Sequence, residues 1–111
     1  MNNEVVLIGS NSMGSPDEKL GRLLLGNFLR ILGDREDLPK FIVLWKGGVQ
    51  IAAKSSDLIE YLKILQGKGV AIISCKTCVE YFGLENDIEV GEIDGMIRIL
   101  DILASHMVLT I

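Results

Sequence analysis

The sequence predicts an α/β layered fold, in which helices pack on a largely parallel sheet of about five strands. Two observations predict this class. Short apolar runs, rich in β-branched residues, alternate along the chain with segments whose apolar residues recur at helical spacing. The connections between these segments are short and contain glycine, serine and aspartate, which is typical of loops between strands and helices. A chain of 111 residues is long enough for one domain, and we expect residues 1–111 to form it.

Five segments are predicted to be strands, because each is a short apolar run bounded by glycine, proline or charged residues. Nearly continuous apolar runs are typical of strands that are buried on both faces of a parallel sheet. The fourth segment is the weakest and is expected to be a short edge strand. The predicted strands are residues 4–9 (EVVLIG), 39–45 (PKFIVLW), 69–74 (GVAIIS), 88–90 (IEV) and 107–111 (MVLTI).

The first predicted helix has the clearest start signal in the chain. Ser15 serves as its N-cap, Pro16 suits the first helical position, and Glu18 completes a capping box. The helix is expected to run to about Leu32 and to pack an apolar stripe on the sheet. The residues of this stripe are Leu20, Leu23, Leu24, Phe28 and Ile31.

Three further helices are predicted by apolar spacing and capping residues. The second covers residues 58–66 and buries Leu58, Ile59, Leu62 and Leu65. A short helix is predicted over residues 79–82. The last predicted helix is capped by Asp94 and ends at about residue 105. Residues 46–48 (KGG) are predicted to be the loop that follows the second strand.

Both cysteines lie where the third predicted strand meets a helix. The strand stops at Cys75, and Thr77 with Glu80 forms a capping-box signature, so a helix is expected to begin at Thr77 or Cys78. The free N–H groups of a helix N-terminus favour a thiolate, and Lys76 adds a positive charge. Cys75 is therefore the stronger candidate nucleophile, and Cys78 is the candidate resolving thiol. Spacing alone is equally compatible with two small, half-buried hydrophobic residues.

Three loops are predicted to leave the same edge of the sheet, where open α/β sheets bind their ligands. We expect these loops to line one pocket. The candidate lining residues are Ser10, Asn11, Ser12, Met13, Gly14, Lys46, Gly47, Gly48, Lys76 and Thr77. The spacing of Gly9 and Gly14 is similar to that of a phosphate-binding loop, but the lysine of such loops is missing, so an ordinary strand-to-helix turn is favoured.

No metal and no cofactor are expected. The C-x-x-C pair supplies only two thiolate ligands, whereas a structural zinc site takes four. The single histidine, His106, lies far along the chain from the cysteines. It is better explained as a residue at a helix end that interacts with the helix dipole.

The charge and hydropathy exclude two classes of partner. With 15 acidic and 11 basic residues, the net charge is −4 and no basic stripe is visible, so direct nucleic-acid binding is not expected. No apolar run approaches the roughly 20 residues of a membrane span, and the N-terminus lacks the features of a signal peptide, so a cytoplasmic protein is expected. The hydrophobic fraction of 49% indicates buried strands and an oligomer interface.

Four stretches resemble the DsrE-like domain of YedF-type proteins, and together they cover nearly the whole chain. The most specific stretch contains both cysteines. The four are VVLIGSNSMGSPDEKLG, LPKFIVLWKGGVQIA, GVAIISCKTCVEYFGL and VGEIDGM.

The resemblance implies a three-layer α/β/α, Rossmann-like fold, a homo-oligomer (dimer or trimer) and a role in sulfur transfer. In the sulfur carriers of the wider family the active cysteine follows a strand, so the persulfide role would map onto Cys75. The implied partners are sulfur-donor and sulfur-acceptor proteins, such as a cysteine desulfurase or a TusA-like domain. YedF-type proteins usually carry an N-terminal TusA-like domain, which this sequence lacks, so a stand-alone relative or an excised domain is expected.

Three hypotheses follow for the function. The leading one is a sulfurtransferase-like carrier of sulfur or selenium, in which Cys75 holds a persulfide and Cys78 discharges it by forming a disulfide. The second is a thiol–disulfide redox module that uses the same pair. The third is a non-catalytic, oligomeric binding subunit with inert cysteines.

Overall fold

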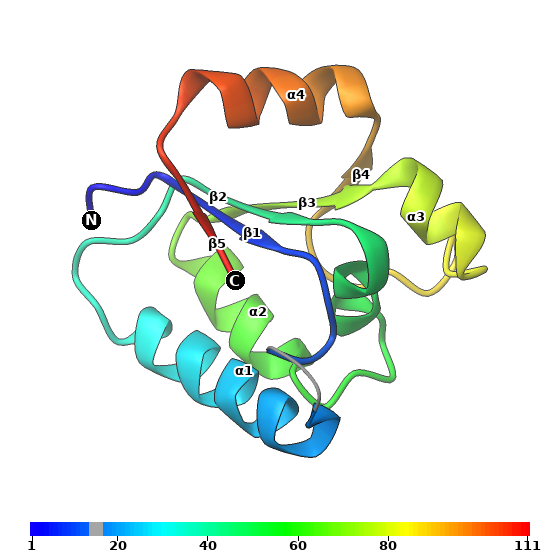
Figure 1. Cartoon of the computed structure of the whole chain (residues 1–111), viewed down its shortest axis with the longest axis horizontal. Coiled ribbons are helices and arrows are strands. Elements are labelled where there is room, and N and C mark those ends of the chain that lie inside the picture. Colours follow the sequence, from blue (N-terminus) through cyan, green and yellow to red (C-terminus); the bar gives the residue numbers. More distant parts are fainter. Residues whose placement is uncertain (14–16) are drawn as a thin grey trace.

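The computed structural model describes residues 1–13 and 17–111, which form three layers. A five-stranded sheet lies in the middle, with the order β4-β3-β2-β1-β5 and all strands parallel. Helices α1 and α2 cover one face, and α4 covers the other (Figure 1). The predicted α/β fold class, with its parallel sheet of five strands, is confirmed. The strands are β1 (Val5–Ile8), β2 (Phe41–Leu44), β3 (Ala71–Cys75), β4 (Glu92–Asp94) and β5 (Val108–Thr110).

The helices fill the connections between consecutive strands. One of them, η1, is a 3-10 helix that begins directly after β2 has ended, where a plain loop was predicted at residues 46–48. No helix of the described residues is long and apolar enough to span a membrane. The helices are α1 (Glu18–Gly33), η1 (Lys46–Ala52), α2 (Ile59–Gly67), α3 (Lys76–Tyr81) and α4 (Met96–Ser105).

Alternating side chains of the strands form two apolar clusters, one on each face of the sheet. In β1, Val6 and Ile8 face α1 and α2, whereas Val5 and Leu7 face α4. The larger cluster adds residues of α1, η1 and α2, and the smaller one adds Ile99 and Ile102 of α4. We call the two sides the α1/α2 face and the α4 face.

The predicted stripe of α1 is wrong. The residues that this helix buries are Gly21, Leu25, Leu29, Leu32 and Gly33, whereas Leu20, Leu23, Leu24 and Ile31 are exposed and Phe28 is half-buried. Leucines occur on several sides of the helix, so spacing alone did not select a face. Gly21 selects the face that is buried, because a Cβ atom there would lie 2.2 Å from the Ser12 Oγ. Only this side of α1 can approach the loop after β1 so closely.

The predicted start signals of the helices were also partly wrong. The N-cap of α1 is Asp17, whose carboxylate accepts a hydrogen bond from the Leu20 N–H at 3.0 Å; Ser15 and Pro16 lie outside the described residues. Helix α4 begins after Gly95 without a side-chain cap, because Asp94 accepts a hydrogen bond from the neighbouring Gly95 N–H instead.

The fourth strand lies later in the chain than predicted. It covers Glu92–Asp94 and pairs with β3, and within residues 88–90 only an isolated antiparallel bridge forms, between Ile88 and Ala53. Gly91 precedes the strand with a φ of +76°. A Cβ atom at Gly91 would lie 2.3 Å from the Ile72 carbonyl oxygen, so the chain reaches the sheet edge only through this glycine.

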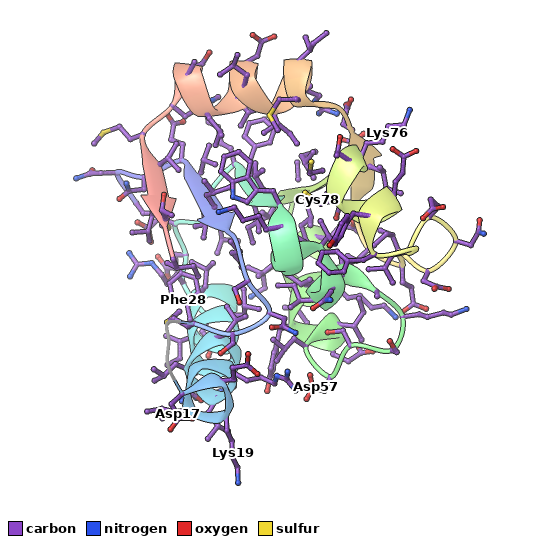
Figure 2. The ribbon with its side chains drawn as sticks, turned by 45° about the vertical axis from the view of Figure 1, so that its right-hand side comes forward. Asp17, Lys19, Phe28, Asp57, Lys76 and Cys78 are labelled. Carbon is purple, nitrogen blue, oxygen red and sulfur yellow. The ribbon has the colours of Figure 1, made fainter. Side chains whose placement is uncertain are left out.

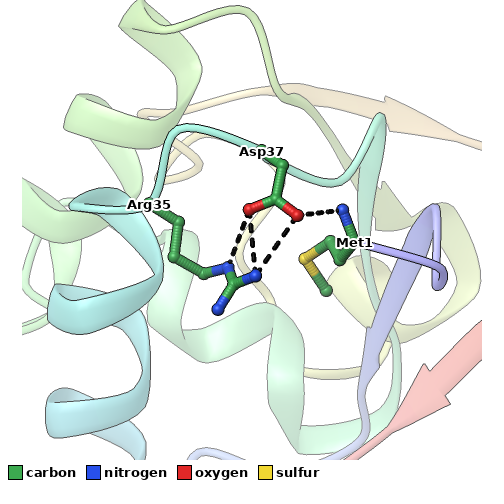
Figure 3. Close-up of polar contacts among 3 residues, drawn as sticks. All are labelled: Met1, Arg35 and Asp37. Carbon is green, nitrogen blue, oxygen red and sulfur yellow. Dashed lines mark hydrogen bonds and ion pairs between the residues drawn. The ribbon is translucent and has the colours of Figure 1, made fainter.

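A charged cluster joins the N-terminal residue to the segment before β2. The Asp37 carboxylate accepts hydrogen bonds from the Met1 amine and from the Arg35 guanidinium (Figure 3). The hydrogen bond from the Met1 amine, and then the charge of Arg35, lower the pKa of the Asp37 carboxyl. All three groups lie far from the carboxyl edge of the sheet, which β1, β2 and β3 reach at Ile8, Leu44 and Cys75.

Candidate functional site

The loops after β1 and β2 meet at the carboxyl edge of the sheet. Gly48 of η1 packs directly on the end of β1, since a Cβ atom there would lie 2.2 Å from the Ile8 carbonyl oxygen. Asn11 in the loop after β1 donates a hydrogen bond to the Gln50 side chain of η1 at 2.8 Å. A Cβ atom at Gly47 would lie 3.8 Å from the Ser10 Cα, which is ordinary contact. Two of the three predicted loops are therefore in contact.

The third loop, which follows β3, contacts the second through the sulfur atom of Cys78. The backbone N–H of Lys46, the first residue of η1, donates a hydrogen bond to the Cys78 Sγ at 3.0 Å. Cys78 lies on α3, directly after β3, so this contact connects the ends of two neighbouring strands. The three loops therefore meet at the carboxyl edge of the sheet, and that they line one pocket stays a prediction.

The two cysteines differ in environment. Cys75 ends β3, is only 2% exposed and belongs to the apolar cluster of the α4 face with Ile99 and Ile102. Cys78 is half-buried and borders the clusters of both faces. Both cysteines are free, and their side chains interact. Cys78 is therefore the more accessible thiol, and Cys75 lies behind it.

Helix α3 begins earlier than predicted. It starts at Lys76, and Cys75 itself is the N-cap residue, so Thr77 and Glu80 lie inside the helix and form no capping box. The side chains of Lys76 and Thr77 are exposed, and Lys76 points out from α3 (Figure 2). Neither residue lines any of the three clefts described below.

The pKa of the Cys78 thiol is raised, not lowered. Burial is the main cause, and the neighbouring Cys75 adds to it; the Lys46 N–H and the positive charge of Lys46 oppose both effects. The expectation of a thiolate at the helix N-terminus is thus wrong for Cys78. Burial of the sulfur and the neighbouring Cys75 outweigh the two contributions of Lys46.

The predicted lining residues of the first loop divide into two groups. Ser10 and Asn11 lie beside η1, whereas Ser12 and Met13 turn toward α1. The Ser12 hydroxyl donates to the Glu18 carbonyl oxygen at 2.9 Å, and the Met13 N–H donates to the Gly21 carbonyl oxygen at 2.8 Å. These two residues hold α1 in place. Gly14 lies outside the described residues.

Three clefts among the described residues are not lined by the cysteines. A cleft of about 620 Å³ lies between α1 and α2, and a smaller polar cleft of about 310 Å³ adjoins it at Arg22 and Asp57. A third, of about 420 Å³, lies beside Phe28 and Leu109. Neither cysteine lines any of the three. Cys78 is half-buried and lines none of these three clefts.

Sequence reasoning missed two features of the site. Ser74, one residue before Cys75, has a fully buried hydroxyl without a hydrogen-bond partner among the described residues. Lys46 was noted for its charge, but its backbone N–H makes the direct contact with sulfur. The signal for this turn in the sequence was the position of Lys46 between a predicted strand and the pair Gly47-Gly48. Within residues 1–13 and 17–111, no group of three or more His, Cys, Asp or Glu side chains could hold a metal ion.

A comparison with protein-family models places the chain in a known family. The model described as DsrE/DsrF-like family matches residues 33–110, which is more than half of the chain and includes β2, β3 and both cysteines. The chain belongs to the DsrE/DsrF-like family. No curated protein sequence matches it.

Solved structures of similar fold cover nearly the full chain. The crystal structure of the ychN protein from E. coli has a TM-score of 0.74 and 19% identity, and the match covers 98% of this chain and 99% of that one. MTH1491 from Methanobacterium thermoautotrophicum, a protein of unknown function, has a TM-score of 0.69 and 20% identity, with 96% of both chains covered. BT1422 from Bacteroides thetaiotaomicron, a conserved protein of unknown function, has a TM-score of 0.68 and 18% identity, with 99% and 96% covered. At these identities the likeness shows the fold.

Proposed function

We propose that this DsrE/DsrF-like protein is a sulfur carrier that holds a persulfide on a cysteine between β3 and α3. The observation that carries the proposal is the pair of free thiols at the carboxyl edge of the sheet, one of them accessible and in contact with a backbone N–H. The family is associated with sulfur relay, which agrees with this chemistry. A thiol near the surface suits transfer between proteins, because a donor protein must bring its own sulfur into contact with it.

The accessibility of the thiols favours Cys78 as the residue that receives sulfur, in place of Cys75 as the resemblance implies. Cys75 is 2% exposed, whereas Cys78 is half-buried. In the loading step, the Cys78 thiolate attacks the outer sulfur of a donor persulfide. A new S–S bond forms on Cys78, the S–S bond of the donor breaks, and the donor leaves as a thiol after taking up a proton. An acceptor thiol then removes the outer sulfur by the same exchange.

The test is intact-mass spectrometry after incubation with a cysteine desulfurase and cysteine. We expect a gain of one sulfur in the parent protein and in Cys75→Ser, and no gain in Cys78→Ser. A gain that is lost only in Cys75→Ser would place the persulfide on Cys75. A protein that gains no sulfur in any form would contradict the carrier function.

A redox function is the second candidate, because the side chains of Cys75 and Cys78 interact. A disulfide between them would form by exchange with an oxidant such as a small-molecule disulfide, which takes up two electrons and two protons and leaves as two thiols. The measurement is a redox titration with quantified thiols, and a reversible loss of both thiols at a defined potential would support this function. Thiols that neither load sulfur nor form a disulfide would leave the non-catalytic binding subunit as the remaining function.

The resemblance to YedF-type proteins extends the proposal to two further points. Selenium can replace sulfur in the same exchange, and the donor or acceptor would be a cysteine desulfurase or a TusA-like domain.

We also propose that the chain is a homo-oligomer, a dimer or trimer, since α1 and α4 both expose apolar side chains. These include Leu20, Leu23 and Ile31 on α1, and Met96, Ile97 and Leu100 on α4. Light scattering at several concentrations measures the number of copies, and a monomer at all of them would contradict this part.

A further inference from the structure

The backbone of Lys46 is the most unusual in the described part of the chain. Its φ is +51°, and no other non-glycine residue of residues 1–13 and 17–111 has a positive φ. A side chain disfavours this left-handed conformation, which is retained only where the surrounding structure imposes it, often at functional sites. The surrounding structure does impose it here. The Trp45 N–H donates to the Ile8 carbonyl oxygen, and the Gly48 N–H donates back to the Trp45 carbonyl oxygen.

The turn at Lys46 explains why its N–H reaches sulfur. The strand hydrogen bonds of β2 end at Trp45, and the chain then bends at once into η1, which packs on the end of β1 through Gly48. The Lys46 N–H is left facing α3, where the Cys78 Sγ accepts it at 3.0 Å. The contact therefore depends on the bend, and the bend depends on the close approach of Gly48 to Ile8.

We propose that Lys46 is the anion-stabilising residue of this site, which holds negative charge on the sulfur of Cys78 through its backbone N–H and its ammonium side chain. The proposal rests on the proposed function, in which Cys78 passes through thiolate and persulfide forms. The N–H contacts the inner sulfur directly, and the exposed, flexible side chain supplies a positive charge beside it. The N–H thus comes from η1, a different element from the helix that carries Cys78.

The electrostatics around Cys78 agree with this role. Two groups act on the thiol: Cys75, which together with burial raises its pKa, and Lys46, whose N–H and charge lower it. Lys46 is therefore the group that opposes desolvation of the anion. Lys76 follows Cys75 in the sequence, but it points out from α3 and is not among the groups that act on Cys78 (Figure 2).

The first test measures how the charge of the Lys46 side chain affects the reactivity of Cys78. In a Cys75→Ser background, Cys78 is the remaining thiol, and its alkylation rate by iodoacetamide is recorded against pH. We expect Lys46→Gln to shift the profile to higher pH and to slow alkylation a few-fold at neutral pH, with no change well above the pKa. Lys76→Gln, the matched control, should leave the profile unchanged. Equal profiles for the two variants, or a larger shift for Lys76→Gln, would overturn the role of the Lys46 side chain.

The second test measures how the hydrogen bond from the Lys46 N–H affects the reactivity of Cys78. Gly48→Ala forces η1 away from the Ile8 carbonyl oxygen and with it the Lys46 N–H, so we expect a larger shift than in Lys46→Gln. Gly47→Ala is the control, because its new Cβ meets nothing closer than 3.8 Å. Lys46→Gly keeps the N–H and accepts the positive φ, so its profile should match that of Lys46→Gln. A Lys46→Gly profile shifted as far as that of Gly48→Ala would overturn the role of the N–H.

Thermal unfolding of each variant separates a loss of fold from a change of reactivity. If Gly48→Ala does not fold, Lys46→Gln, Lys46→Gly and Lys76→Gln still decide the role of the side chain, and amide-to-ester replacement at residue 46 decides that of the N–H. Alkylation needs no sulfur donor. A failure of this inference is therefore distinguishable from a failure of sulfur loading.

Discussion

The two faces of the sheet are built from the same strands but are covered very differently. On the α1/α2 face, two helices and η1 bury a continuous apolar cluster that reaches Leu62 and Leu65, both fully buried. On the α4 face, one helix of ten residues buries Ile99 and Ile102 against the strands. The outer side of α4 remains apolar, and Ile97 is 86% exposed. The second face is thus the thinner layer.

This difference matters for the cysteines, because Cys75 lies in the apolar cluster of the α4 face and Cys78 borders the clusters of both faces. Cys75 belongs to the apolar cluster that the strands form with Trp45, Cys78 and α4. A single amphipathic helix opens more readily than a layer of several packed elements, since fewer apolar contacts must be broken. We therefore expect the buried thiol to lie beneath the less stable layer of the core, whereas the accessible thiol contacts the Lys46 N–H at the start of η1.

The largest expected effect is on the α1/α2 face. Leu62→Ala removes a fully buried side chain of α2 and leaves a cavity among rigid neighbours, so the free energy of unfolding should fall by about 2–5 kcal/mol. Urea denaturation measures it. Ile64→Ala on the same helix removes a side chain that is 51% exposed and should cost less than about 1 kcal/mol. Similar losses for the two variants would mean that α2 is not part of the main core.

A smaller loss of stability is expected on the α4 face. Ile99→Ala also removes a fully buried side chain, but α4 can move toward the sheet and close part of the cavity, so we expect about 2–3 kcal/mol. The same variant should raise the alkylation rate of Cys75, measured in a Cys78→Ser background, because α4 opens more often. Leu62→Ala is the control for this rate. If Ile99→Ala costs more than Leu62→Ala, or leaves Cys75 protected, the α4 layer is not the weaker one.

The smallest effect concerns the ion pairs that join β4 to α4. The hydrogen bond from Arg98 and then that from the Gly95 N–H lower the pKa of Asp94. Because the folded pKa is lower than the unfolded one, Asp94 contributes stability above its unfolded pKa, and this contribution is lost as pH falls through the folded pKa. Asp94→Asn should therefore lose a little stability at neutral pH and show a weaker decline in acid.

Urea denaturation at several pH values measures this dependence. Asp101→Asn on the same helix is the control, because Asp101 makes no ion pair within the described residues. The difference between the two variants should be small, since exposed ion pairs contribute little and are screened by salt. An identical pH dependence in both would show that the contact between β4 and α4 does not depend on this pair.

Much of the fold could be predicted from local sequence, and much of the site could not. The apolar runs predicted β1, β2 and β3, because a strand buried on both faces needs such a run, and the half-buried edge strand β5 has one as well. The short β4 was placed too early in the chain, because two of its three residues, Glu92 and Asp94, are charged and the strand reaches β3 through the turn at Gly91. The glycine was visible in the sequence, but the reason for it, the nearby Ile72 carbonyl, was not.

The sequence by itself determined the alternation of strands and helices, the parallel sheet and the position of both cysteines at its carboxyl edge. These properties follow from the spacing of apolar residues and from turn residues, which act over a few neighbouring positions. Only the tertiary structure decided which side of α1 is buried, which cysteine is accessible and which N–H contacts sulfur. The reason is physical: burial and the partner of a backbone N–H depend on residues far apart in the chain, such as Gly21 with Ser12 and Lys46 with Cys78.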